Sequence, residues 1–224
     1  MDRLEFLRIR SQYVFFLLFL FVFSVTGCVS TSRYQALESE YGTLQEENQQ
    51  LKTELDEQKS WHEQEIEAKE IQEQALQEMI AELQEEIDAK LVRIQMMENY
   101  LKVELVEKLL FESASAKVSR EGRKILARIA PILKRAGGQE IHVVGHTDEL
   151  PPSARTKEKY PSNWELSTAR ATNVVQILQW GYGIDPHRLV AEGMAHYRPL
   201  NMGKDQGVRA RNRAVEILLK PVRQ

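Results

Sequence analysis

Three hydrophobic patterns follow one another along the chain. An uncharged apolar run extends from Tyr13 to Phe23, and apolar residues with a seven-residue repeat follow it. Beyond residue 101, short apolar runs alternate with segments that have the apolar spacing of a helix. This order predicts an apolar N-terminal segment, then a long helix, then a domain in which helices pack on a sheet.

The apolar run has the flanks of an export signal. Three arginines precede it, and Val25-Thr26-Gly27-Cys28, with the only cysteine of the chain, follows it. A basic start, an apolar core of about 7–15 residues and small residues before a cut are typical of a secretory signal. The tetrad resembles a bacterial lipobox, in which the cysteine is lipidated and becomes the first residue after cleavage.

Residues 1–27 are therefore expected to be a lipoprotein signal peptide, and residues 28–33 a lipidated N-terminus with a short linker. The bacterial sorting pattern, applied to Val29, implies lipid anchoring through Cys28 in the outer membrane of a Gram-negative bacterium, facing the periplasm. The alternative is an uncleaved anchor over residues 12–30, which could span a bilayer if tilted.

The seven-residue repeat predicts a coiled coil. Its apolar positions are Tyr34, Leu37, Tyr41, Leu44, Leu51 and Leu55. Asn48 occupies the core position of the repeat (heptad position a) at which an apolar residue is missing. A buried amide at this position favours a dimer. The seam fails over residues 58–69 and resumes at Leu76, and residues 32–100 hold 18 acidic against 6 basic residues. We expect residues 34–101 to be an acidic spacer and a homodimer; the alternative is a frayed coil in which Asn48 has no role.

Residues 102–224 are predicted to fold as one α+β domain, a two-layer sandwich of helices on a mixed four-stranded sheet. This part holds 13 acidic against 21 basic residues, which suits either ordinary solubility or attraction to a polyanion. Ser119 and Ser162 are expected to cap two helices, the second with a capping box to Glu165 and an end near Trp180. The first helix should kink at Pro131 and end at Gly137-Gly138. The strands are expected at Val103–Phe111, Glu140–Gly145, Leu189–Glu192 and Ala214–Leu219.

One arginine stands inside the apolar stripe of the second helix. Arg170 shares a face with Leu166, Val174 and Ile177, and an unpaired buried charge is very costly. Asp148, near the end of the preceding strand, is the expected partner. Either the two form a structural bridge, or the loop holds them apart and a zwitterionic ligand completes both, with its carboxylate on the arginine and its ammonium on the aspartate.

Three motifs together resemble a known family. They are Gly145–Asp148, Asn163–Ala171 and Arg209–Ile217. With them, residues 103–220 resemble the OmpA-like peptidoglycan-binding domain shared by OmpA, the Pal lipoprotein and MotB. The stretches Tyr160–Ser167 and Gly181–Pro186 are most similar to the MotB branch.

The resemblance implies that the domain binds the diaminopimelate residue of the peptide stem. The principal binding residues carry over to Asp148 and Arg170. The secondary positions match Thr147, Asn163, Leu166 and Arg213, and Phe111 matches a residue near the pocket floor. Ala214 departs from the family, which usually has a second arginine there.

The sequence disfavours three other functions. No acidic residue lies between Ser11 and Ser32, so the chain lacks the membrane-embedded aspartate of a proton-conducting stator. His142 and His146 lie four residues apart in a strand, about 13 Å, too far to share one zinc ion. No serine or cysteine nucleophile is paired with a base in a known motif, and export separates the chain from nucleic acid. The expectation is a non-catalytic protein without metal or cofactor that tethers the envelope to the cell wall, or else a flagellar-motor or secretion-system accessory.

Overall fold

The structure, a computed structural model, describes residues 3–222, with side chains from residue 31 onward and at a few positions between residues 13 and 21. It divides into a unit that ends at His62 and a unit that begins at Glu63. Most side chains of the expected signal peptide, and that of the predicted lipidation site Cys28, lie outside the described ones.

The first unit is helical. It belongs to α1 (Arg3–Glu82), in which no proline interrupts the helix. The apolar seam residues between Tyr34 and Leu55 are all exposed in the single chain, by between 49% and 69%. Within the described part of the chain, no helix combines the length and the hydropathy that crossing a bilayer requires.

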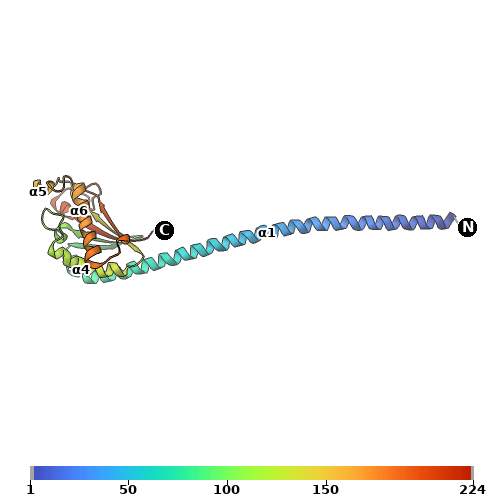
Figure 1. Cartoon of the computed structure of the whole chain (residues 1–224), viewed down its shortest axis with the longest axis horizontal. Helices are drawn as coiled ribbons and strands as arrows, with labels where there is room; N and C mark the ends of the chain where they lie inside the picture. The colour runs from blue at the N-terminus through green and yellow to red at the C-terminus, as the bar shows by residue number, and fades with distance from the viewer. Residues whose placement is uncertain (1–2, 223–224) are drawn as a thin grey trace. The chain divides into compact units, whose positions relative to one another are not determined.

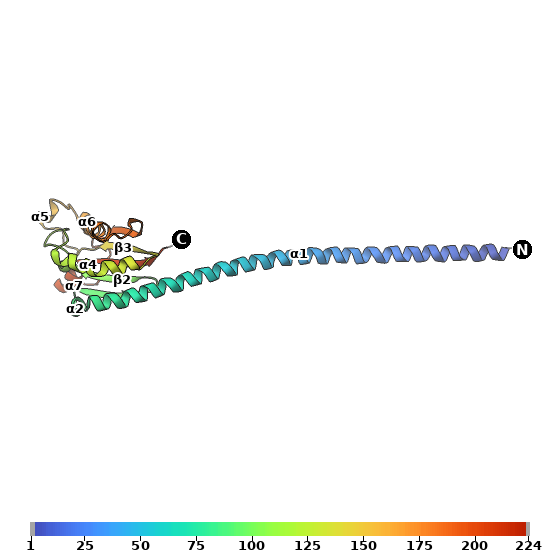
Figure 2. The same ribbon diagram turned by 60° about the horizontal axis from the view of Figure 1, so that its bottom comes forward.

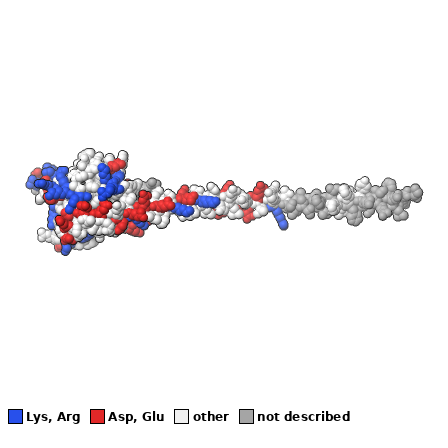
Figure 3. Space-filling view, turned by 90° about the horizontal axis from the view of Figure 1, so that it is seen from below, with Lys and Arg blue, Asp and Glu red and all other residues white. Residues whose placement is uncertain are grey.

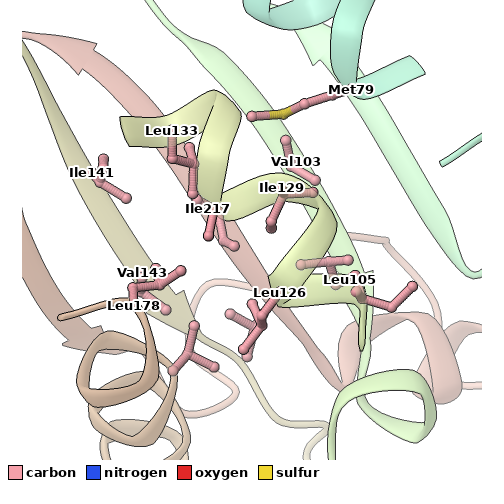
Figure 4. Packing of buried hydrophobic residues seen from close by; sticks show 14 of the residues in the cluster. Met79, Val103, Leu105, Leu126, Ile129, Leu133, Ile141, Val143, Leu178 and Ile217 are labelled. Atoms are coloured by element: carbon pink, nitrogen blue, oxygen red, sulfur yellow. The ribbon is translucent and has the colours of Figure 1, made fainter. Parts of the chain in front are cut away.

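The last turns of α1 belong to the second unit. Ala75, Met79 and Leu83 are almost fully buried in its hydrophobic core, and the amide of Gln72 donates to the Leu219 carbonyl oxygen at 3.3 Å. A short helix, α2 (Gln84–Asp88), follows. Figure 4 shows Met79 reaching toward Val103 and Ile129.

The prediction of a helix that continues to residue 101 is wrong. After α2 the chain forms a hairpin of β1 (Val92–Met96) and β2 (Leu101–Val106). Val92 and Ile94 alternate with polar residues and pair with Leu105 and Val103, so their period is two, as in a strand. The expected helical spacer included Val92 and Ile94, because short apolar runs fit either period.

The sheet has five strands in the order β1-β2-β5-β3-β4, and Figure 1 shows it beside the helices of the second unit. The strands β3 (Gln139–Gly145), β4 (Leu189–Gly193) and β5 (Ala214–Pro221) lie close to their predicted positions. Only the β3–β4 pair is parallel among the described strands, so the predicted mixed sheet is confirmed, with β1 added at its edge. The first predicted strand ends early, because α3 (Glu107–Leu110) follows β2.

Two amphipathic helices lie against this sheet, as Figure 2 shows for α4 and α6. Helix α4 (Arg120–Arg135) begins at Ser119, whose side chain accepts from the Gly122 amide, so this cap is confirmed. Helix α6 (Asn163–Gln176) begins with the predicted capping box and continues as a π-helix, η1 (Ile177–Gly181). The remaining helical turns are α5 (Ala154–Lys157), η2 (Pro186–Arg188) and α7 (Gln206–Asn212).

Two glycines set the depth at which α6 packs. A Cβ atom at Gly145 would lie 2.2 Å from the Ser167 carbonyl oxygen, and one at Gly193 would lie 2.2 Å from the Thr168 hydroxyl. Only a residue without a side chain permits this approach of helix to sheet. The contact brings the first turns of α6 over the ends of β3 and β4, where the predicted site residues lie.

Candidate functional site

Arg170 is a residue of α6 whose side chain is buried. Its side chain is 3% exposed, and its Nε and Nη2 atoms each donate to the Ser115 carbonyl oxygen at 3.2 Å. Nη2 also donates to the Glu107 carboxylate, and the guanidinium carbon lies 5.2 Å from the centre of the Phe111 ring. Burial lowers the pKa of Arg170 and the Glu107 charge opposes this, so the carboxylate is what makes a buried cation tolerable here.

Asp148 has a different cation. Its Oδ2 atom accepts from Arg213 Nη1 at 2.6 Å, and its Oδ1 atom accepts from the Leu150 amide at 3.1 Å. Arg213 Nε in turn lies 2.8 Å from the second oxygen of Glu107. Burial works to lower the pKa of Arg213, but Asp148 and Glu107 outweigh it and raise this pKa.

Four charges therefore alternate in sign, in the order Arg170, Glu107, Arg213, Asp148. Of the two expected arrangements, the direct bridge between Asp148 and Arg170 is wrong, since the ion pairs of the described residues connect each to another partner. Glu107 separates them because it opens α3, where its amide also donates to the Arg213 carbonyl oxygen at 2.8 Å. We call these four residues the charge network.

Sequence reasoning missed Glu107. It was placed inside a strand that was expected to reach Phe111, where an acid would be one more residue on an alternating face. The available signal was its position between Val106 and an apolar Leu109-Leu110-Phe111 run. An acid next to residues that must be buried needs a cation, and the arginines of the other motifs supply it.

The loop after β3 is held by backbone and amide contacts. Asn163 Nδ2 donates to the carbonyl oxygens of Asp148 and Leu150, at 3.2 and 2.9 Å. Thr147 donates its amide to the Ala195 carbonyl oxygen at 2.9 Å, and its buried hydroxyl has no hydrogen-bond partner among the described residues.

The predicted residues divide into two groups in the structure. Asp148, Arg170 and Arg213 belong to the charge network, and Phe111, 4% exposed, lies under the Arg170 guanidinium. Thr147 lies in the loop after β3, and Asn163 and Leu166 lie in the first turn of α6. Leu166 is 6% exposed. The arrangement can hold a molecule with one ammonium and one carboxylate, by exchange with internal partners of the same charge.

His146, at the start of the same loop, also has two partners for its side chain. Its Nε2 atom lies 3.0 Å from the Glu216 carboxylate and its Nδ1 atom 3.1 Å from the Arg198 carbonyl oxygen. Burial raises the pKa of Glu216, but the hydrogen bond with His146 and the charges of His146 and Lys102 outweigh it and lower this pKa. The described residues include no group of three or more metal-ligating side chains that could hold a metal ion.

The charge network predicts the effect of Glu107→Gln. This variant keeps the shape of the side chain but leaves Arg170 and Arg213 facing each other without the intervening charge. Because the Glu107 side chain is 20% exposed, we expect a loss of about 2–3 kcal/mol, less than for a fully buried pair. Urea denaturation measures it.

The matched control is Glu112→Gln, which removes a carboxylate that pairs with Lys117 at the surface. Exposed pairs contribute about 0–1 kcal/mol. Equal stability changes in the two variants would contradict the special role of Glu107.

The contact between His146 and Glu216 predicts a pH dependence. A carboxyl whose pKa is lowered by folding stabilises the folded state above its ordinary value of 4.5, and this contribution is lost as the pH falls. Glu216→Gln should therefore cost about 1–3 kcal/mol at pH 7, and the difference from the natural chain should shrink below pH 4.5. Urea denaturation at pH 7 and at pH 3 tests this, with the exposed Glu158→Gln as control; an equal loss at both pH values would contradict it.

Comparisons with known proteins find relatives of the C-terminal unit. Residues 110–213 match the OmpA family. Protein YtxE of Bacillus subtilis (strain 168) is 37% identical over 116 residues, which cover 52% of this chain and 46% of YtxE. The chain spans about half the length of the curated relatives it matches.

Two solved structures share the fold. A MotB-like protein from Desulfovibrio vulgaris superposes with a TM-score of 0.62 at 28% identity, over 70% of this chain and 99% of that one. The cell wall anchor of the T6SS from Pseudomonas aeruginosa does so with a TM-score of 0.57 at 35% identity, over 64% of this chain and 97% of that one. The chain thus carries, from residue 110 to residue 213, an OmpA-like domain whose neighbours are MotB-like.

Proposed function

We propose that this protein is a non-catalytic tether, held in the outer membrane by lipid on Cys28 and bound to peptidoglycan through the C-terminal unit. The observation that carries the proposal is the charge network in an OmpA-like domain. The similarity to a protein described as a cell wall anchor supports the same ligand. The acidic helix between lipid and domain is then a spacer.

The proposed ligand is the diaminopimelate residue of the peptide stem, which offers an ammonium and a carboxylate on one carbon. The ammonium takes the place of the Arg213 guanidinium at Asp148. The carboxylate takes the place of Asp148 at Arg213 and approaches Arg170 beside Glu107, which keeps its contacts with both arginines. Arg213 is the most accessible of the four charges, with a side chain 37% exposed, so the ligand meets it first. Because each ligand group replaces a protein group of the same charge, every charge keeps a partner of opposite sign.

The remaining predicted residues have supporting roles in this proposal. The Thr147 hydroxyl, buried and unpaired, gains a hydrogen bond from or to the ligand. Asn163 fixes the carbonyl oxygens that orient Asp148, and Leu166 and Phe111 form an apolar floor. The floor excludes water and so strengthens the ionic contacts above it.

Binding to purified sacculi tests the site. Asp148→Asn and Arg213→Ala should each weaken retention by tenfold or more, about 1.4 kcal/mol, because each removes one partner of a charge-assisted contact. Arg211→Ala, an exposed arginine of α7 outside the charge network, is the control and should bind normally. If both site variants are folded by circular dichroism and bind as well as the control, the site assignment is wrong.

Lipidation predicts how the chain fractionates. At about 0.8 kcal/mol per buried methylene, two or three acyl chains on Cys28 hold a protein permanently in a membrane. Cys28→Ser should move the protein from the membrane to the soluble fraction, while Ser30→Ala should not. Mass spectrometry of the mature N-terminus gives an independent answer: an intact Met1 would contradict the lipoprotein and favour the anchored alternative.

The exposed seam of α1 supports a homodimer. Its apolar side chains are uncovered in the single chain, and Asn48 uses its amide on the Leu44 carbonyl oxygen at 3.0 Å. A parallel partner would cover this seam at the a and d positions. Leu44→Asp combined with Leu51→Asp should halve the mass found by sedimentation equilibrium, whereas Gln50→Asp, at an outward position, should not. A monomer mass for the natural chain would remove the dimer.

A second function is supported by the neighbours themselves. One is a MotB-like protein and another is the cell wall anchor of the T6SS, so the acidic helix could instead recruit a motor or secretion partner while the C-terminal unit holds the wall. The motor version predicts a swimming defect in a deletion strain. Normal swimming with reduced envelope integrity would favour the general tether.

A further inference from the structure

A ridge of neutral side chains follows α6 and η1. Trp164, Thr168, Thr172, Gln176 and Trp180 are spaced four residues apart, so they form one ridge that is inclined to the helix axis. They are exposed or half-buried, and the two tryptophans at the ends are 48% and 72% exposed. This row is unusual because tryptophan is rarely left so open unless it has a partner.

Two hollows accompany the ridge. The first, about 530 Å³, is lined by Tyr160, Trp164, Thr168 and Thr172 among others. The second, also about 530 Å³, is lined by Gln176, Trp180 and Tyr182. Asn173 is part of both walls, so the two hollows meet at the middle of the helix. Each has the size of an ordinary ligand site.

The ridge carries almost no charge. From Trp164 to Tyr182 the charged residues are Glu165 and Arg170. Arg170 is buried in the charge network, and the Glu165 carboxylate is occupied by Ser162 in the capping box. Figure 3 shows basic and acidic side chains interspersed over the face of the C-terminal unit that it draws. Lys117 and Arg123 line the second hollow from outside the helix, and Lys117 pairs with Glu112. The row itself, of indole rings, hydroxyls and amides, suits a neutral, polyhydroxylated ligand.

Trp164 is already held in position. Its ring stacks on Tyr197 with 5.4 Å between centroids and 23° between planes, and Tyr197 stacks on His196 at 4.2 Å. The same Trp164 side chain lines the first hollow. A ring fixed before binding loses little entropy when a ligand packs on it, and the C–H face of a sugar ring packs well on an indole.

The ridge starts next to the proposed peptide site. Trp164 follows Asn163, which holds the Asp148 loop, and the helix from residue 163 to residue 181 is roughly 28 Å long at 1.5 Å per residue. That length suits an extended polymer. We propose that the ridge from Trp164 to Trp180 is a glycan track, which binds the neutral N-acetylhexosamine strand of peptidoglycan while the charge network holds its peptide stem. The inference rests on the proposed function and adds the sugar strand to its ligand.

The test uses the full chain and two separate probes. One is a hexamer of β-1,4-linked N-acetylglucosamine, which has no peptide, and the other is free diaminopimelic acid. Titration calorimetry should show hexamer binding that Trp164→Ala and Trp180→Ala each weaken at least fivefold. Trp61→Ala, which removes an equally exposed tryptophan from α1, should leave it unchanged. Trp164→Phe should restore part of the binding, since it keeps an aromatic face.

The outcomes separate the two proposals. If diaminopimelic acid binds and the hexamer does not, or if the hexamer binds equally to both tryptophan variants, the glycan track is wrong and the peptide site stands. If the hexamer binds to the ridge but diaminopimelic acid binds nowhere, the track stands and the peptide site is wrong. If Trp180→Ala instead lowers the mass in sedimentation and leaves hexamer binding unchanged, the ridge is an interface between copies and the track is overturned.

Discussion

The carboxylate of Glu107 joins two arginines that would otherwise repel each other at the centre of the C-terminal unit. One of them, Arg170, is almost wholly removed from water, where a guanidinium without an anion would destabilise the fold by several kcal/mol. The other, Arg213, connects Glu107 with Asp148 and so brings the third motif against the first. Four parts of the chain that are far apart in sequence are thereby held in one place by alternating charge.

Backbone contacts decide where those charges can stand. The glycines at the ends of β3 and β4 let α6 approach the sheet so closely that any β-carbon would collide with its backbone or side chains. His146 and Asn163 then fix the loop between strand and helix from two sides. These contacts fix the backbone that carries the charged side chains, so the charges are in position before a ligand binds. A specific ligand site requires such a pre-arrangement.

Much of this could be predicted from the sequence, and the failures have physical reasons. The capping box of Ser162 and Glu165 has a local cause, and it appeared where expected. The strand after Leu189 also follows from its neighbours along the chain. The β1–β2 hairpin did not, because Ile94 and Leu101 fit a helical repeat as well as a strand, and only pairing with β5 decides between them. The partner of Arg170 could not be predicted either. Asp148 and Glu107 could each have balanced its charge, and only the fold brings Glu107 into contact with it.

The burial of Ala75, Met79 and Leu83 makes the end of α1 and the residue after it part of the hydrophobic core of the C-terminal unit. The Gln72 amide adds hydrogen bonds to Gln139 of β3 and to the Leu219 carbonyl oxygen of β5. Cutting the chain after these turns would expose the hydrophobic surface that they cover, so a stable fragment of the domain has to begin before Gln72.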